Sequence, residues 1–220
     1  MLKTLSGRVI GVVGWKDSGK TTVVESMVSL LNAKGFTVGT VKHIHGELSL
    51  QPDAKDSARH LDAGAETSAV AGDGVVVLER RGDGDLETVA ARYLSLCDVI
   101  VVEGFKHAEI PKVAVLSETD DILEDASNVV AVVYRKAKPE AFPAFKADDI
   151  QGLVDFLLEN EVLKTSGAMA TLMVNGRPVP INEFVQASLA GVLRGFIAAL
   201  HDVEPPETIQ LTINQRCSGG

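Results

Sequence analysis

The stretch "GWKDSGKTT" at residues 14–22 limits the folds open to this chain more than any other feature. It fits the pattern G-x-x-x-x-G-K-[ST], in which glycines let backbone N–H groups turn toward phosphate oxygens. The pattern has meaning only between a buried strand and a helix. Residues 8–13, "RVIGVV", are almost wholly apolar, as in a strand covered on both faces, and residues 21–35 carry apolar side chains at helical spacing. The sequence therefore predicts a phosphate-binding loop between a strand and a helix.

Each polar residue of the predicted loop has an expected part. The Lys20 ammonium is expected to reach the β- and γ-phosphates, and the Thr21 hydroxyl is expected to ligate Mg²⁺. The start of the helix adds the positive end of its dipole. Lys20 is also a catalytic candidate. We expect the nucleotide to be bound by Gly14, Lys16, Asp17, Ser18, Gly19, Lys20, Thr21 and Thr22.

The rest of the first 165 residues alternates between apolar runs and helical patterns. We expect strands at 36–43, 67–72, 74–80, 98–104, 112–116 and 128–134, and helices at 53–64, 86–97 and 148–163. Such alternation is typical of βαβ units, so it predicts an α/β fold of the P-loop NTPase type with a doubly wound, mostly parallel sheet. The pair Asp73-Gly74 predicts an antiparallel hairpin in addition.

The sequence changes character after residue 165, which divides the chain into a nucleotide-binding domain at 1–165 and a small module at 166–220. The module is predicted to be ββαβ, with a hairpin at 170–181, a helix at 182–203 and a last strand at 207–214. The helix has an apolar face and a face of small residues. We expect them to pack against the module's own sheet or the first domain, or to form a helix pair across a dimer interface. They consist of Val185, Leu189, Val192 and Phe196, and of Ala187, Gly191, Gly195 and Ala199.

Two acidic residues are candidates for a metal-linked role beside the loop. Glu103 ends the strand at 98–104, and ligands of open α/β sheets collect at the carboxyl ends of strands. Asp56 lies beyond the second strand, where Asp53 competes for the same role and where either residue would also serve as a helix cap. We predict Thr21, Asp56 and Glu103 as Mg²⁺ ligands, with both carboxylates as catalytic candidates.

Basic residues at the ends of strands are candidates for contact with an anion. Lys42, His43 and Lys106 lie at the ends of the predicted strands at 36–43 and 98–104. Solvated loop side chains are the equal alternative for the two lysines. The groups "KHIH" and "FKH" also suggest a transition-metal site. No cysteine pair supports that site, and phosphate contact or plain loop structure fits the histidines better.

Charge and composition bear on partners and compartment. The formal net charge is -9 at pH 7, which opposes binding to nucleic acid or to an anionic membrane. Cys97 and Cys217 form no CxxC pair, and the apolar run near the start is too short for a signal peptide or a membrane span. We therefore expect a cytoplasmic protein. The chain has no N-K-x-D motif and no glutamine close after Gly104. Its residues therefore do not determine which nucleotide base is bound, and they predict no fast hydrolysis.

Four segments taken together resemble the molybdopterin-guanine dinucleotide biosynthesis protein B family: "GWKDSGKTT", "GTVKHIHG", "DAKDSARHLDAGA" and "VVEGFKHAEIPKV". The resemblance implies a Mg²⁺-dependent GTP-binding protein with weak GTPase activity, commonly a homodimer. It also implies an accessory role beside the guanylyltransferase that joins GMP to molybdopterin, with molybdopterin itself a candidate ligand. It assigns phosphate contacts to 14–22, metal or water roles to Asp56 and Glu103, and site-lining roles to Lys42, His43 and Lys106.

Two other functions fit the same residues. A P-loop kinase or phosphotransferase acting on a small anion would use the lysines and histidines at the strand ends. A metal-delivery GTPase would use the histidine group. The segment after residue 166 resembles a C-terminal extension of some family members, and the sequence leaves its role open.

Overall fold

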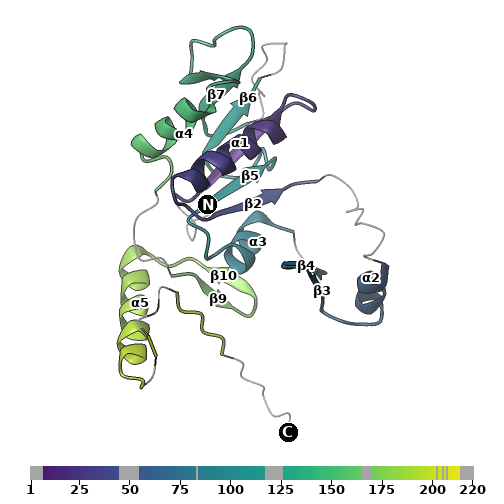
Figure 1. The fold of residues 1–220 in the computed structure, drawn as a ribbon, viewed down its shortest axis with the longest axis vertical. Helices are drawn as coiled ribbons and strands as arrows, with labels where there is room; N and C mark the ends of the chain where they lie inside the picture. Colours follow the sequence, from purple (N-terminus) through teal and green to yellow (C-terminus); the bar gives the residue numbers. More distant parts are fainter. Residues whose placement is uncertain are drawn as a thin grey trace.

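A six-stranded sheet flanked by helices makes up the larger part of the chain, and two smaller units lie beside it in the computed structural model of Figure 1. No helix within the described residues is long and apolar enough to cross a membrane. The structure describes residues 7–44, 55–82, 84–116, 126–164, 170–201, 203–204, 206 and 208–213, without the side chains of residues 55 and 56.

All strands of the large sheet are parallel, which confirms the predicted fold class, and β1 lies between β5 and β6. The sequence does not predict β8, because this strand has three residues at the sheet edge and none of them is buried. In spatial order the strands are β2 (Val38–Lys42), β5 (Val99–Glu103), β1 (Val9–Gly14), β6 (Lys112–Val115), β7 (Val129–Tyr134) and β8 (Ala144–Lys146).

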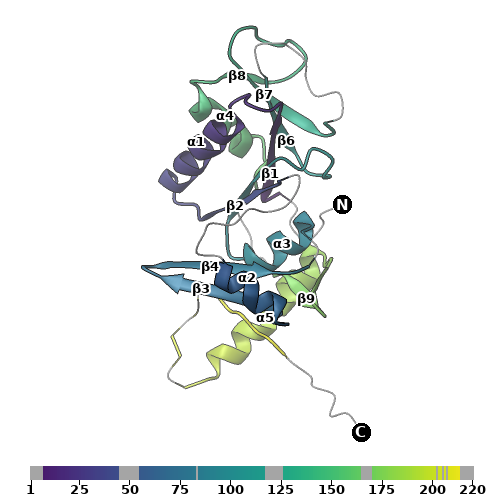
Figure 2. The same cartoon turned by 90° about the vertical axis from the view of Figure 1, so that its right-hand side faces the viewer.

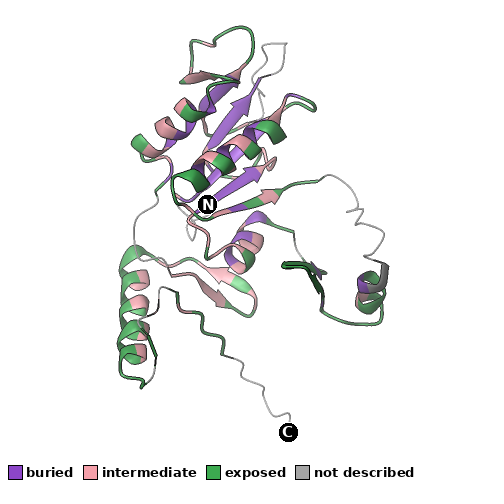
Figure 3. Ribbon diagram, viewed as in Figure 1, coloured by how far each residue is buried: buried purple, intermediate pink, exposed green. Residues whose placement is uncertain are grey.

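Helices cover both faces of this sheet, and alternate strand residues face opposite sides. Ile10 belongs to a core cluster shared with α1 (Lys20–Ala33) and α4 (Ile150–Glu159). Its neighbour Val9 belongs to a second cluster shared with α3 (Leu86–Tyr93) on the other face. Figure 3 shows the central strands buried between these helices. The sheet is thus a rigid support, with the loop after β1 at the carboxyl edge of its middle strand.

A separate unit of one helix and one hairpin follows β2. The hairpin turn is the predicted Asp73-Gly74 pair, both with positive φ, but its strands pair only with each other among the described residues. Val75 and Val76 are each 63% exposed, and successive side chains point to opposite faces of a strand, so both faces of this hairpin are uncovered near its turn. Figures 1 and 2 show the unit apart from the large sheet. Its elements are α2 (Lys55–Asp62), β3 (Thr67–Gly72) and β4 (Val75–Arg80).

The C-terminal module contains the predicted hairpin, β9 (Leu172–Val174) and β10 (Arg177–Val179), and helix α5 (Glu183–Ala198). The hairpin turn contacts α3, where Arg92 Nη2 donates a hydrogen bond of 2.8 Å to the carbonyl oxygen of Gly176. The boundary proposed at 165/166 falls on residues 165–169, which lie outside the described residues, so it stays a prediction.

The last strand predicted at 207–214 is wrong for the residues that are described. Residues 208–213 have no regular secondary structure, so the module is ββα there rather than ββαβ. Leu211 and Ile213 are 61% and 74% exposed. The apolar alternation that suggested a strand is present, but among the described residues β9 and β10 pair only with each other, and residues 208–213 pair with no sheet.

The predicted packing of these two faces of α5 on the module's own sheet or the first domain is also wrong, while the alternative of a helix pair across a dimer interface stays a prediction. Of its predicted apolar face, only Val185 is half-buried, while Val192 and Phe196 are 71% and 65% exposed. The small-residue face is open too, because a Cβ atom on Gly191 or Gly195 would meet nothing within 4 Å. The half-buried positions follow a different face, which consists of Gln186, Ala190, Leu193 and Ile197. Amphipathic spacing identified the helix but not the side that packs.

Candidate nucleotide site

The loop between β1 and α1 depends on two glycines. A Cβ atom on Gly14 would lie 2.5 Å from the carbonyl oxygen of Val115 and 2.6 Å from Ser18 Oγ, so a side chain does not fit there. Gly19 is the N-cap of α1 with φ of 95°, a left-handed conformation that glycine adopts without strain. No side chain among the described residues caps this helix start, so its first N–H groups are available to an anion.

Ser18 adds an unsatisfied hydroxyl inside the loop. Its side chain is 2% exposed, and its Oγ has no hydrogen-bond partner within the described part of the chain. An unpaired buried polar group costs about 1–3 kcal/mol, and nearly all such groups in proteins find a partner in protein, water or ligand. A hydroxyl beside free helix N–H groups is the donor set that a phosphate group requires.

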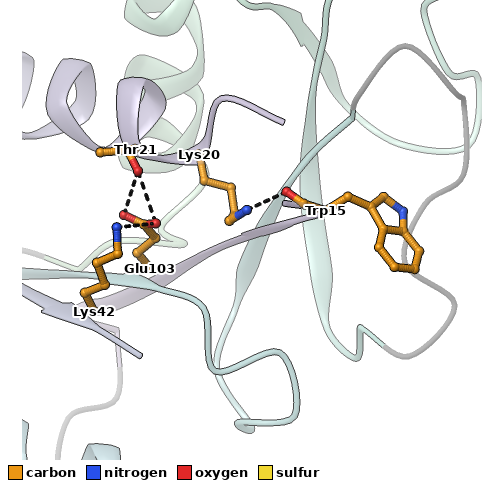
Figure 4. A network of polar contacts seen from close by, with 5 residues as sticks. All are labelled: Trp15, Lys20, Thr21, Lys42 and Glu103. Carbon is orange, nitrogen blue, oxygen red and sulfur yellow. Dashed lines mark hydrogen bonds and ion pairs between the residues drawn. The ribbon is translucent and has the colours of Figure 1, made fainter. Parts of the chain in front are cut away.

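Glu103 joins the start of α1 to the end of β2, as Figure 4 shows. The Thr21 hydroxyl donates toward both carboxylate oxygens, each at 3.2 Å. On the other side, Lys42 Nζ lies 3.1 Å from Glu103 Oε1. Lys20 is engaged separately, because its Nζ donates to the carbonyl oxygen of Trp15 at 2.5 Å. The Trp15 indole points away from this group and is 53% exposed.

Strand register brings Glu103 and Lys42 together. In the parallel ladder between β1 and β5, Glu103 is the partner of Val12, two residues before the loop. In the ladder between β2 and β5, Lys42 is the partner of Glu103. Both side chains therefore leave their strands at the carboxyl edge, next to the loop. Glu103 thus lies beside the loop, where a metal-linked acid was expected, and its role toward a ligand, like that of Lys42, stays a prediction.

His43 and Lys106 lie on the segments that leave β2 and β5. The backbone N–H of His43 donates to the carbonyl oxygen of Glu103 at 2.9 Å. The His43 ring packs on Phe105, with ring centroids 4.5 Å apart and planes inclined at 38°. Lys106 is half-buried in the turn that follows Phe105. The His43 ring thus contributes to packing in this structure, and its predicted anion contact stays a prediction.

Asp56 is not described at the level of its side chain. It belongs to α2, which packs on the hairpin β3–β4, and Figure 1 shows this helix away from α1 and the loop. Its competitor Asp53 lies outside the described residues. The metal-linked role of Asp56 therefore stays a prediction.

Histidine, cysteine and acidic side chains do not form a transition-metal cluster in the described ranges. No three of them converge there in a way that could hold a metal ion. His45, half of the "KHIH" pair, lies outside those ranges. The pairing of a threonine hydroxyl with a carboxylate is different chemistry, because such hard oxygen ligands suit Mg²⁺.

Sequence reasoning missed one residue at this edge, Arg135. It is the first residue after β7, and its guanidinium lies against Gly19. The rule that selected Glu103, a charged residue where a strand ends at the carboxyl edge, would have selected Arg135 as well. However, β7 is two strands from β1, so whether Arg135 reaches the loop depends on how its side chain extends.

A parallel sheet with this strand order and a glycine loop between its middle strand and the next helix define a P-loop α/β protein. The family model described as molybdopterin guanine dinucleotide synthesis protein B, MobB, matches residues 9–135, more than half of the chain. The chain therefore belongs to the MobB family.

Individual relatives agree with this family. A Bacillus subtilis (strain 168) protein with the name of a molybdopterin-guanine dinucleotide biosynthesis adapter is 38% identical, over 68% of this chain and 91% of its own. A Methanocaldococcus jannaschii protein with the same kind of name is 26% identical over 94% of this chain and 97% of its own, so the match extends into the C-terminal module. The crystal structure of Bacillus subtilis MobB is similar with a TM-score of 0.60 at 37% identity, over 72% of this chain and 99% of its own.

Proposed function

We propose that this chain is a GTP-binding accessory protein of molybdopterin guanine dinucleotide synthesis that uses Mg²⁺ and assists the guanylyltransferase. The observation that carries the nucleotide part is the position of Glu103 across from Thr21, at the mouth of a loop that is rich in free donors. Family membership supports the pathway and the accessory role.

The residues present fit a magnesium nucleotide. The Thr21 hydroxyl and the Glu103 carboxylate would hold Mg²⁺, and the first N–H groups of α1, Ser18 Oγ and Lys20 Nζ would bind the phosphate chain. The metal would supply charge neutralisation between phosphate oxygens. The Lys20 ammonium would leave the Trp15 carbonyl for phosphate oxygens, where its full charge has an opposite partner.

Hydrolysis is proposed to be slow. The Thr21 hydroxyl contacts both Glu103 carboxylate oxygens and Lys42 contacts one of them, so neither oxygen is free to position an attacking water. Binding with slow turnover fits a protein that acts through a partner enzyme rather than through its own product.

Calorimetric titration with GTP and with ATP, each with Mg²⁺ or with EDTA, tests the nucleotide part. We expect GTP to bind more tightly than ATP and Mg²⁺ to strengthen its binding. The variant Lys20→Ala is expected to abolish binding, and Lys138→Ala, which removes an exposed lysine, serves as the matched control. Clear preference for ATP would refute the GTP assignment, and full affinity in Lys20→Ala would refute the site.

Capture of the partner is a separate test. Immobilised chain is expected to retain purified molybdenum cofactor guanylyltransferase, and the amount retained is expected to depend on bound GTP. No retention in any nucleotide state would refute the accessory role and leave nucleotide binding standing. Addition of molybdopterin to either protein would show whether this ligand takes part in the complex.

We further propose that the chain acts in the cytoplasm as a homodimer that uses the hairpin β3–β4. A two-stranded hairpin is marginal alone in water, and this one exposes an apolar set on both faces, which consists of Val70, Val75, Val76, Val77 and Leu78. Light scattering after size exclusion is expected to give twice the chain mass for the wild type and the chain mass for Val76→Lys. Val174→Lys, on exposed β9, is the control. A wild-type monomer at all concentrations would refute this part.

A further inference from the structure

Arg135 lies against the phosphate loop from the side opposite Glu103. In the sheet order, β5 and β2 flank β1 on one side and β6 and β7 on the other, so Glu103 and Arg135 approach the loop from different directions. A Cβ atom built on Gly19 would lie 2.6 Å from Arg135 Nη2, 3.7 Å from its Cζ and 3.9 Å from its Nε. The guanidinium therefore points its Nη2 end at the helix N-cap.

The Arg135 guanidinium is without a partner in the part of the chain that the structure describes. It makes no hydrogen bond and no ion pair with any described residue, and the residue is exposed. Its position beside the start of α1 is electrostatically unfavourable in the free chain, because the helix dipole is positive at that end. Lys20, the first residue of α1, adds a second cation nearby. A positive group held at a positive helix end is favourable only when an anion lies between them.

Gly19 makes this approach possible. Any other residue at this position would need to hold a left-handed backbone and would place a Cβ atom where Arg135 Nη2 now lies. Gly19 therefore has two roles, because it allows the left-handed turn of the loop and leaves room for the Arg135 side chain. The planar guanidinium carries five N–H donors in a fork that matches two phosphate oxygens.

We propose that Arg135 is a phosphate-contacting residue of the nucleotide site, which binds the phosphate chain from the β7 side while Thr21 and Glu103 hold the metal from the other. This inference rests on the proposed nucleotide function, and it adds a residue outside the loop motif.

The test compares Arg135→Ala, Arg135→Lys, Lys138→Ala and Lys20→Ala in the full chain. Calorimetry gives the Kd of GTP with Mg²⁺, and competition gives the Kd of magnesium pyrophosphate, which has no base or ribose. Because hydrogen bonds to charged groups are strong, Arg135→Ala is expected to raise both Kd values by about tenfold or more. Arg135→Lys is expected to raise both Kd values by a smaller factor, since lysine keeps the positive charge but not the forked N–H donors of the guanidinium. Lys138→Ala is expected to stay within about twofold, because exposed charges contribute little.

Each outcome of these measurements either supports or overturns the phosphate contact of Arg135. Arg135→Ala is expected to melt within about 2 °C of the wild type, because an exposed residue without a partner contributes little to stability. Wild-type affinity in Arg135→Ala, with binding lost in Lys20→Ala, overturns the role of Arg135 and leaves the nucleotide site standing. A weaker GTP but unchanged pyrophosphate affinity assigns Arg135 to the base or ribose and overturns phosphate contact, as does pyrophosphate that fails to compete for the wild type. If the wild-type chain binds no nucleotide, the proposed function fails and the inference with it.

Discussion

Replacement of Lys112 by methionine tests how the segment after Glu103 is held. Lys112, the first residue of β6, is fully buried, and its Nζ donates to three carbonyl oxygens. The acceptors are Ala108, Ile110 at 3.2 Å and Ser127 at 2.8 Å. Two of them belong to the turn that follows β5 and carries Lys106. One ammonium thus connects this turn to the segment just before β7.

The expected cost follows from these contacts. Methionine keeps most of the volume of the lysine stem, so the change is mainly the loss of donors and charge. Three hydrogen bonds from a charged donor contribute about 1.5–3 kcal/mol each, and burial of the ammonium opposes them by several kcal/mol. The net loss in unfolding free energy for Lys112→Met is therefore about 2–4 kcal/mol.

Urea denaturation of the wild type and Lys112→Met at neutral pH measures this difference. Lys146→Met, at an exposed position of β8, is the matched control and is expected to stay within about 0.5 kcal/mol. A Lys112→Met protein as stable as the wild type, or more stable, would refute the reasoning. It would show that burying the ammonium costs as much as its three bonds contribute.

The pH dependence of the same difference has a defined sign. Burial lowers the pKa of Lys112 below its ordinary 10.5, with Glu109 opposing the effect in part. Between the lowered pKa and 10.5 the unfolded chain binds more protons than the folded chain, so stability rises with pH in that window. The advantage of the wild type over Lys112→Met is expected to grow from neutral to alkaline pH.

Three other changes have defined outcomes. Hydrogen bonds from the Thr37 hydroxyl and N–H lower the pKa of Asp98 below 3.8. Asp98→Ala is therefore expected to lose about 1 kcal/mol of unfolding free energy at pH 7. In chemical denaturation this difference should vanish as the pH falls below about 4 and through the lowered pKa, because the carboxylate becomes protonated in both states. Gly19→Ala is expected to lose about 1–2 kcal/mol of unfolding free energy from its left-handed φ, and an unchanged melting curve would contradict this. Glu103→Gln is expected to keep GTP affinity in EDTA but to lose the gain from Mg²⁺, whereas exposed Glu109→Gln should keep both.

The central sheet was predictable from sequence because its strands are continuous buried apolar runs, and such runs have few alternatives. β5 shows this best, since Val99 to Val102 are all buried and the acid at its end lies where parallel strands must meet. β8 was not predictable, because an edge strand of three half-buried or exposed residues carries no such pattern.

The packing of the elements around the sheet depends on which other elements they contact, and a sequence pattern does not specify those contacts. The apolar spacing of α5 predicted a helix correctly, yet Val192 and Phe196 are exposed, because spacing defines a face without defining what covers it. Arg135 escaped prediction for a related reason. Its closeness to Gly19 depends on strand order and on the reach of one side chain, and neither is local in sequence.

The pairing of Thr21, Lys42 and Glu103 makes ligand binding at this site an exchange of partners. In the free chain Glu103 already has a hydroxyl and an ammonium, and Lys20 already has the Trp15 carbonyl. A magnesium nucleotide bound as proposed would have to displace these contacts, so its measured affinity would be a difference between two sets of bonds. Free phosphate, which brings no metal to replace the partners of Glu103, would gain less from the exchange. At the proposed site the resting contacts would therefore disfavour inorganic anions relative to a magnesium nucleotide.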